Sequence, residues 1–201
     1  MKDYQKIIHI YYTALMTYLV FTFANNLFQQ VVTDHSLEII LYVILWGLLV
    51  IQTTFAYVHI MKIPSTNYTI CALISDGLDI GFSVYICAVI SGACADVSNY
   101  LRLSIPFLLI AVNQFYWYLK VKEFNPSAVF RLVLLFLGML LITISECISH
   151  GIWNLIAIVI WDGIVMGLLR STEWVPPIFA IMLESKWNKV KQKEFVRKHF
   201  C

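Results

Sequence analysis

Long apolar runs separated by short polar segments occupy most of the chain. A helix rises about 1.5 Å per residue and the hydrocarbon core of a bilayer is about 30 Å thick, so roughly 20 residues cross it. Runs of about this length lie at residues 7–28, 37–60, 68–91, 101–120, 129–149 and 152–171. The pattern predicts an all-α fold in which residues 1–171 form a polytopic membrane bundle of six transmembrane helices.

The composition supports this class. The chain has 201 residues, of which 60% are hydrophobic and 13% are charged, and its mean hydropathy is +0.78. A soluble domain of this length could not hide so much apolar surface. The first run is too long for the core of a cleaved signal peptide and lacks a small-residue cleavage site, so it is predicted to be a signal anchor.

The distribution of Lys and Arg predicts the orientation. If the N-terminus is cytoplasmic, every Lys and Arg except Arg102 falls on the cytoplasmic side of the six spans. This asymmetry is the positive-inside pattern. We therefore expect an integral protein of the inner or plasma membrane with both termini in the cytoplasm.

The tail, residues 172–201, differs in character because apolar residues alternate there with basic ones. The pattern predicts a basic amphipathic helix at the cytoplasmic interface, where anionic lipid contributes about 1 kcal/mol per well-placed basic residue. The tail is also the predicted docking element for any cytosolic partner. A nucleic-acid role is not favoured.

Three carboxylates lie where lipid would be expected. Asp76 and Asp79 are in the third span and Asp162 is in the sixth. An ionised carboxylate facing lipid near the bilayer centre costs about 2.5–3.5 kcal/mol, so these groups are expected to face protein or water. Two interpretations have equal weight: a cation or proton site, and a hydrogen-bonded pair that fixes the bundle. Gly77 and Gly81 form a GxxxG step that predicts close approach of another helix.

Further polar positions interrupt the spans. Gln52 and Asn113 lie near mid-depth in the second and fourth spans. Such amides are more often interhelical hydrogen-bonding groups than ligands. Glu146 and His150 are four residues apart at the outer end of the fifth span. They are candidates for a proton relay or gate, although an ordinary hydrogen bond at the outer interface is favoured over that role.

A weak internal repeat links the two halves of the chain. Asp162-Gly163 repeats Asp76-Gly77 at an offset of 86 residues, and Asn113 repeats Asn26 at 87. Halves of three spans each would be inverted relative to each other in the membrane, as in many transporters. The spacing raises the hypothesis of a 3+3 inverted repeat.

Motifs for cofactor chemistry are absent from the sequence. The five cysteines form no CxxC, the histidines form neither HxxxH nor HExxH, and there is no Walker motif or dinucleotide fingerprint. The sequence therefore predicts no cofactor, metal site or catalytic residue, and an enzyme is less favoured than other classes.

The leading hypothesis is a small transporter or ion channel that is linked to cations or protons and can form a homo-oligomer. Its path would lie between the third and sixth spans. Asp79 and Asp162 would be the groups that respond to a cation or a proton, and Asp76 would support them. Gln52 and Asn113 would line the path.

Two alternatives remain. The first is a non-enzymatic accessory or effector protein, pore-forming or regulatory, that acts with a cytosolic system. The second is a membrane enzyme that modifies lipid, which would require Asp76, Asp162, Glu146 and His150 to converge on one cavity.

Overall fold

Helices are the regular elements throughout the part of the chain that the computed structural model describes, which is residues 3–34, 36–62, 70–92, 100–121, 125–172, 174–186 and 188. The elements are α1 (Asp3–Thr22), the π-helical η1 (Phe23–Leu27), α2 (Phe28–Thr33), α3 (Leu37–Lys62), α4 (Ile70–Gly92), α5 (Leu101–Val121), α6 (Pro126–Ile148), α7 (Ile152–Asp162), the π-helical η3 (Gly163–Leu168) and α8 (Leu169–Thr172). Residues 177–186 form one more helix.

The predicted all-α class is confirmed, and the helices occupy the apolar runs of the sequence. Four of them are long and apolar enough to cross a membrane: Tyr4–Thr33, Leu37–Lys62, Ile70–Gly92 and Pro126–Ile148. Two further apolar stretches, Leu101–Tyr116 and Ile152–Leu168, are shorter. The fold is therefore compatible with a membrane protein, whereas the six crossings and the inverted repeat are not confirmed by it.

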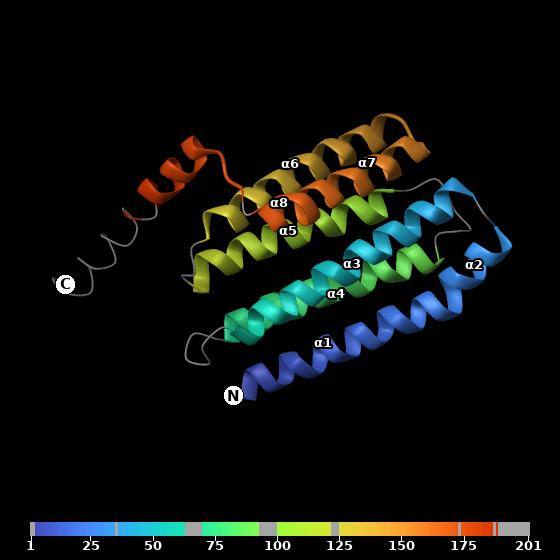
Figure 1. Ribbon diagram of the computed structural model, residues 1–201, viewed down its shortest axis with the longest axis horizontal. Coiled ribbons are helices and arrows are strands. Elements are labelled where there is room, and N and C mark those ends of the chain that lie inside the picture. Colours follow the sequence, from blue (N-terminus) through green and yellow to red (C-terminus); the bar gives the residue numbers. More distant parts are fainter. Residues whose placement is uncertain are drawn as a thin grey trace.

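The elements from α1 to α8 form six rods. The long axes of these rods run in roughly the same direction (Figure 1). The first rod is α1 with η1 and α2, and the last is α7 with η3 and α8. Neighbouring rods close into a ring, in which contacts join α1 to α4, α4 to α5, α5 to α6, α6 to α7, α7 to α3 and α3 to α1. The ring gives the bundle an interior that all six rods can reach.

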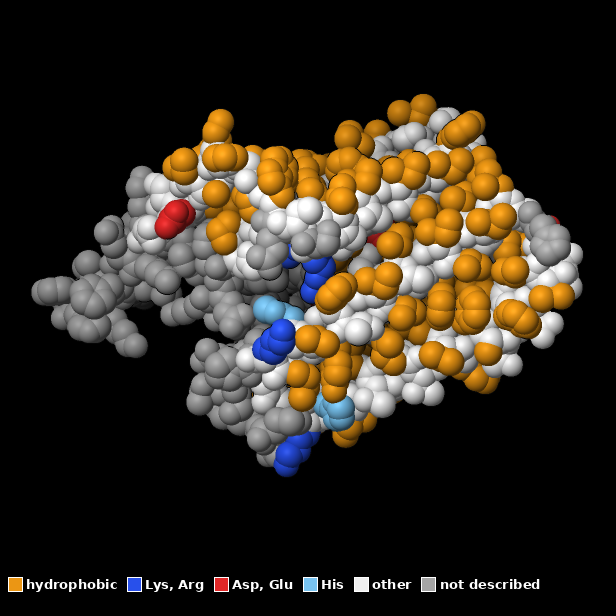
Figure 2. Space-filling model, viewed as in Figure 1, with side chains coloured by type: hydrophobic (Ala, Val, Ile, Leu, Met, Phe, Trp, Pro, Cys, Tyr) orange, Lys and Arg blue, Asp and Glu red, His pale blue; other side chains and the backbone are white. Residues whose placement is uncertain are grey.

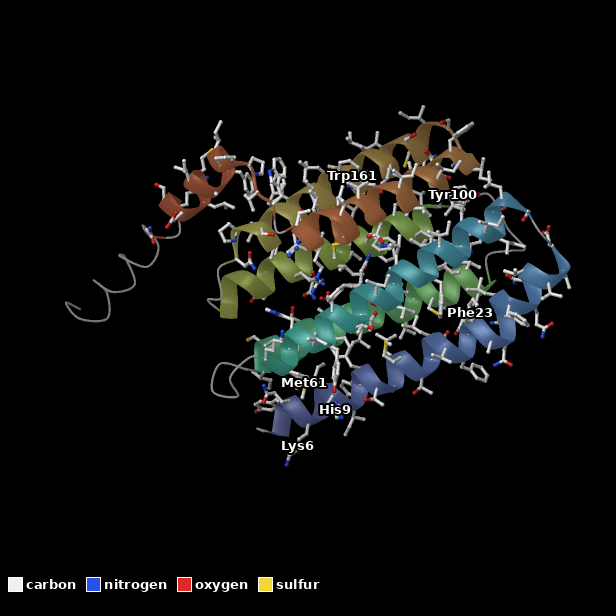
Figure 3. All side chains as sticks on the ribbon, in the orientation of Figure 1. Lys6, His9, Phe23, Met61, Tyr100 and Trp161 are labelled. Carbon is white, nitrogen blue, oxygen red and sulfur yellow. The ribbon has the colours of Figure 1, made fainter. Side chains whose placement is uncertain are left out.

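The two ends of the bundle differ in charge. We call the end that holds the start of α1 and the end of α3 the basic end; Lys6 and Met61 mark it in Figure 3. Tyr100 lies at the other end, which we call the acidic end because Glu38 and Glu146 lie there.

Close packing fills the half of the bundle toward the acidic end. Its core joins large side chains from every rod, and several of them have no more than 1% of their surface exposed: Leu19, Leu45, Leu49, Ile86, Ile90, Leu103, Phe107, Leu135, Met139 and Ile158. Indole hydrogen bonds also join the rods. Trp46 Nε1 donates to the carbonyl of Leu19 at 3.1 Å, and Trp161 Nε1 donates to the carbonyl of Leu134 at 3.0 Å.

Among the glycines, Gly138 has the closest side-chain neighbour, and the GxxxG step does not. A Cβ added at Gly138 would overlap the indole of Trp161, so α6 and the last rod pack closely only because this position lacks a side chain. At Gly77 and Gly81 an added Cβ would meet no atom within 4 Å. The expected close contact at Gly77 and Gly81 is therefore wrong within the described bundle.

Polar side chains on the outside of the first rod bond to backbone carbonyls of the same rod. Thr13 and Thr17 hydroxyls donate to the carbonyls of His9 and Thr13 at 2.9 Å, and the Asn25 amide donates to the carbonyl of Phe21 at 3.1 Å. A hydroxyl or amide that is satisfied in this way can face an apolar environment at little cost. This explains how exposed polar residues are compatible with a stretch that is long and apolar enough to cross a membrane.

The described part of the tail contacts the start of α6 through aromatic rings. The ring of Phe130 lies 6.0 Å from that of Trp174 and 4.9 Å from that of Phe179. Ile178, Ile181 and Met182 on the same helix are exposed. Most of the basic residues on which the amphipathic prediction depends fall after residue 188, outside the described residues.

Candidate functional site

A cavity of about 660 Å³ lies inside the ring of rods, toward the basic end. All six rods contribute to its wall, which mixes apolar side chains with polar ones. The polar and charged wall residues are Tyr12, Gln52, Thr53, His59, Lys62, Asp76, Asp79, Ser83, Gln114, Asn125, Arg131 and Arg170. The sequence predicted polar groups at mid-depth, and the cavity explains why several of them need no lipid contact.

Asp79 is the carboxylate whose partners are best defined. The Asn113 amide on α5 donates to Asp79 Oδ1 at 2.7 Å and also to the carbonyl of Ser75 at 2.7 Å. The Ser75 hydroxyl returns a bond of 3.1 Å to the side-chain oxygen of Asn113. Gln114 is a second amide neighbour of the Asp79 carboxylate. Asp79 thus lies on the cavity wall with amide partners and is half-buried.

Asp76 lies one turn from Asp79 and lines the same cavity. It is buried, with 5% of its surface exposed. Tyr12 of α1 is close enough to both carboxylates to feel their charge. Both carboxylates therefore lie on the side of α4 that faces the cavity.

Asp162 has a different environment. It has no exposed surface, and the Gln52 amide on α3 donates to its Oδ2 at 2.6 Å. Its other carboxylate oxygen, Oδ1, has no hydrogen-bond partner among the described residues. Gln52 itself lines the cavity, whereas Asp162 does not. Gln52 therefore stands between the cavity and the buried carboxyl group.

Asp79 on α4 is therefore hydrogen-bonded to Asn113 on α5, whereas Asp162 on α7 is hydrogen-bonded to Gln52 on α3. Asp79 lines the cavity directly, whereas Asp162 is connected to it only through Gln52. Ser83, another polar group on the wall, was not singled out from the sequence.

Basic side chains gather at the mouth of the cavity. His59 and Lys62 come from α3, Arg131 from α6 and Arg170 from α8. The guanidinium carbon of Arg170 lies 4.3 Å from the centre of the Phe55 ring. Figure 2 shows blue basic side chains and a pale-blue histidine beside the hollow in this face of the molecule. The cavity thus carries positive charge at its mouth and carboxylates on its inner wall.

Glu146 and His150 form a separate cluster at the acidic end. Glu146 has no exposed side-chain surface, and its Oε1 lies 2.8 Å from Nδ1 of His150, which is 59% exposed. The Asn154 amide donates to Glu146 Oε2 and, at 3.0 Å, to the carbonyl of Ser149. The Ser145 hydroxyl donates to Asn154 Oδ1 at 3.1 Å. Asn154, which the sequence analysis missed, connects the end of α6 to the start of α7.

A second set of contacts closes the acidic end. Glu38 Oε1 accepts hydrogen bonds from the Tyr42 hydroxyl at 3.0 Å and from the Tyr100 hydroxyl at 3.5 Å. Burial, with Glu38 and Glu146 nearby, raises the pKa of Tyr100 to about 12, so its hydroxyl remains a donor at neutral pH. These contacts join α3 to the chain just before α5.

The candidate residues therefore fall into two places. Asp76, Asp79 and Gln52 line the cavity, and Asn113 and Asp162 are hydrogen-bonded to Asp79 and Gln52 on its wall. Glu146 and His150 lie at the acidic end. Asp162 is ten residues, about 15 Å, along its rod from Ile152 at the acidic end. The convergence that a lipid-modifying enzyme would need is not present in the described bundle.

Among the described residues, no group of three or more His, Cys, Asp and Glu side chains is arranged to hold a metal ion. No family model, curated protein or solved structure matches the chain.

Proposed function

We propose that the protein is a small integral membrane transporter that is linked to protons or small cations. In this proposal the six rods cross the membrane, the termini are cytoplasmic, and the cavity opens to the cytoplasm at the basic end. The asymmetry of Lys and Arg supports the orientation.

The observation that carries the proposal is the position of Asp79 on the wall of the interior cavity. A carboxylate within an apolar bundle is costly unless it has a function or a compensating partner. The partners of Asp79 are amides, which donate hydrogen bonds but supply no positive charge. Such a group is suited to bind a proton or a small cation that enters through the cavity.

The closed half of the bundle favours a transporter over an open channel. Beyond the cavity, toward the acidic end, the interior is filled by the tightly packed core described above. A channel needs a continuous path, whereas a transporter exposes its site to one side at a time. In this proposal the structure is taken as an inward-open state, in which the contacts of Glu38, Tyr42 and Tyr100 belong to the closed outer side.

Gln52 gives the second buried acid a role in this scheme. Its amide bonds to Asp162 while its side chain lines the cavity, so a change in cavity occupancy can alter the environment of Asp162. We propose that Asp79 is the primary ion or proton site and that Asp162 acts through Gln52.

Flux measurements in proteoliposomes test the proposal. The wild type is expected to move protons or a monovalent cation down an imposed gradient, and Asp79→Asn is expected to lower the rate at least 10-fold because the amide cannot carry the charge. Asp34→Asn is the matched control, since Asp34 is exposed beyond the end of α2. Helical circular dichroism and size-exclusion profiles establish that each variant is folded.

Two results would overturn the transporter. One is an absence of flux from folded wild-type protein across several cations and pH gradients. The other is unchanged flux in folded Asp79→Asn. The accessory hypothesis predicts no flux and a function that depends on the basic tail, so deletion of residues 189–201 would then be the variant that matters.

A further inference from the structure

The acidic end holds a hydrogen-bonded cluster that is separate from the cavity. Glu146, near the end of α6, has no exposed side-chain surface, and its Oε1 lies 2.8 Å from Nδ1 of His150. The Asn154 amide on α7 donates to Glu146 Oε2. His150 is in the short turn between α6 and α7, and its side chain is 59% exposed. One histidine therefore connects the buried carboxylate to the surface of the acidic end.

A second carboxylate, that of Glu38, shares Tyr100 with Glu146. The Tyr100 hydroxyl donates to Glu38 Oε1 at 3.5 Å, and Glu146 is close enough to Tyr100 to affect its charge. Tyr100 is buried just before α5. The closed acidic end therefore places a carboxylate of α3 and a carboxylate of α6 near one buried hydroxyl group. Two like charges in such a place repel each other more strongly than they do in water.

The other charged groups at this end are exposed to solvent. Among the described residues they are Arg102, near the start of α5, and Asp34, after the end of α2. The Cys147 thiol beside Glu146 is exposed as well, and the first turns of α7 are uncharged. Solvent screens exposed charges, so the charge balance around Glu146 depends chiefly on His150, the basic side chain that contacts it.

We propose that His150 and Glu146 form an external proton-binding site that controls the outer gate of the transporter. Protonated His150 holds the gate closed, and loss of its proton favours opening. The inference rests on the proposed transport function, and it specifies how access from the outer side is regulated.

The direction of the effect follows from the charges. The imidazolium form of His150 donates Nδ1–H to Glu146 and offsets its negative charge. After the ring gives its second proton to water, a neutral Nδ1–H can still donate, but Glu146 and Glu38 are then two uncompensated carboxylates near Tyr100. Moving the turn between α6 and α7 away from α3 lets water hydrate both of them. Histidine suits this role because its charge changes between about pH 5 and pH 8.

Cys87 on α4 is a natural reporter of opening. It has no exposed surface, and it belongs to the core that fills the half of the bundle toward the acidic end. It lies five residues, about 8 Å, from Gly92 at the end of its helix. A water-soluble thiol reagent reaches this side chain only when the packed half opens.

The experiment measures how fast a small methanethiosulfonate labels Cys87 in the full chain, in phosphatidylcholine nanodiscs at about pH 5 and about pH 8. The other cysteines, Cys71, Cys94, Cys147 and Cys201, are replaced by serine. Each rate is divided by the rate for the same protein denatured in sodium dodecyl sulfate and urea at the same pH, which removes the pH dependence of the thiol itself.

Two variants test the charges. His150→Gln keeps a neutral hydrogen-bond donor at the turn but cannot become positively charged, and Glu38→Gln keeps an acceptor for the tyrosine hydroxyls but removes one of the two like charges. The matched control is His9→Gln, which removes an exposed histidine at the basic end (Figure 3).

We expect the normalised rate of the wild type to be about two- to five-fold higher at the higher pH, the range that a partly exposed ion pair supports. His150→Gln should label at one rate at both pH values, the rate of the wild type at the higher pH. Glu38→Gln should label more slowly than the wild type at the higher pH, and His9→Gln should behave like the wild type.

A wild-type rate that does not change with pH would overturn the inference, as would a wild-type pH dependence in His150→Gln. If His150→Gln does not fold, Glu38→Gln decides, and an unchanged rate at the higher pH then refutes the gate. The labelling needs no transport, so its failure is distinguishable from failure of the transporter proposal. Flux that depends on Asp79, together with labelling that is independent of pH, would remove the gate and leave the transporter.

Discussion

The hydrogen bond between Gln52 and Asp162 gives a sharp test of how this bundle holds a buried acid. A double-mutant cycle consists of the single variants Gln52→Met and Asp162→Leu and the double variant that combines them. Methionine keeps the length of glutamine, and leucine repeats the branched outline of aspartate. Gln29→Met on the exposed face of α2 is the control for the glutamine substitution.

The structure predicts that the two single substitutions have unequal costs. Asp162 has no exposed surface and Gln52 is its hydrogen-bond partner, so Gln52→Met leaves a buried carboxyl group with none. Loss of a hydrogen bond to such a group costs about 1.5–3 kcal/mol of unfolding free energy. Asp162→Leu leaves the Gln52 amide on the cavity wall, where water can hydrate it, so we expect less than about 1 kcal/mol.

Replacing both partners removes the unsatisfied group altogether. The double variant is therefore expected to be within about 1 kcal/mol of the wild type, with a coupling energy of about 1.5 kcal/mol or more. The measurement is unfolding by sodium dodecyl sulfate in mixed micelles, followed by circular dichroism and tryptophan fluorescence. Additivity within about 0.5 kcal/mol, or a larger cost for Asp162→Leu than for Gln52→Met, would refute the reasoning.

Two further predictions concern packing and the acidic end. Gly138→Ala should lower the melting temperature by several degrees, because the added methyl group overlaps Trp161 and overpacking costs about 1–3 kcal/mol. Gly81→Ala, the control with open space around the added methyl group, should be neutral or slightly stabilising. Equal melting temperatures of the two variants would contradict this packing. Asn154→Ala should cost about 1–3 kcal/mol in the same detergent titration, because buried Glu146 loses an amide donor; a neutral effect would show that Asn154 does not fix the turn between α6 and α7.

The positions of the helices were predictable from the sequence because they depend on local features. Apolar runs and their polar breaks set the bounds. At α6 the start is also fixed chemically, since the Asn125 side chain accepts bonds from the backbone N–H groups of Ser127 and Ala128 at 3.0 and 3.3 Å, with Pro126 as the first helical residue. The sequence is weaker evidence that α5 and the last rod cross a membrane, because their apolar stretches are shorter than those of the other rods.

The pairing of polar groups was not predictable in the same way. Asp79, Asn113, Gln52 and Asp162 were each recognised as polar points at similar depth, but which amide meets which acid depends on the order of rods around the ring. The 86-residue spacing placed Asp76 and Asp162 at equivalent positions of a repeat, whereas Asp76 lines the cavity and Asp162 is behind Gln52. The π-helical segments give no sequence signal comparable to an apolar run, and one of them begins immediately after Asp162.

The contrast between the two amide-paired acids separates a structural role from a functional one. If the Gln52–Asp162 bond only joins α3 to α7, the folded double variant Gln52→Met/Asp162→Leu keeps the wild-type flux, because apolar packing replaces the bond. If Asp162 responds to the cavity through Gln52, that variant folds as well as the wild type and loses coupled flux. Asp79 differs because it faces the cavity directly. Under the transporter proposal, Asp79→Asn should therefore lower flux at least 10-fold in either case. Comparing flux and stability in the same set of variants therefore decides which of the two acids only holds the bundle together.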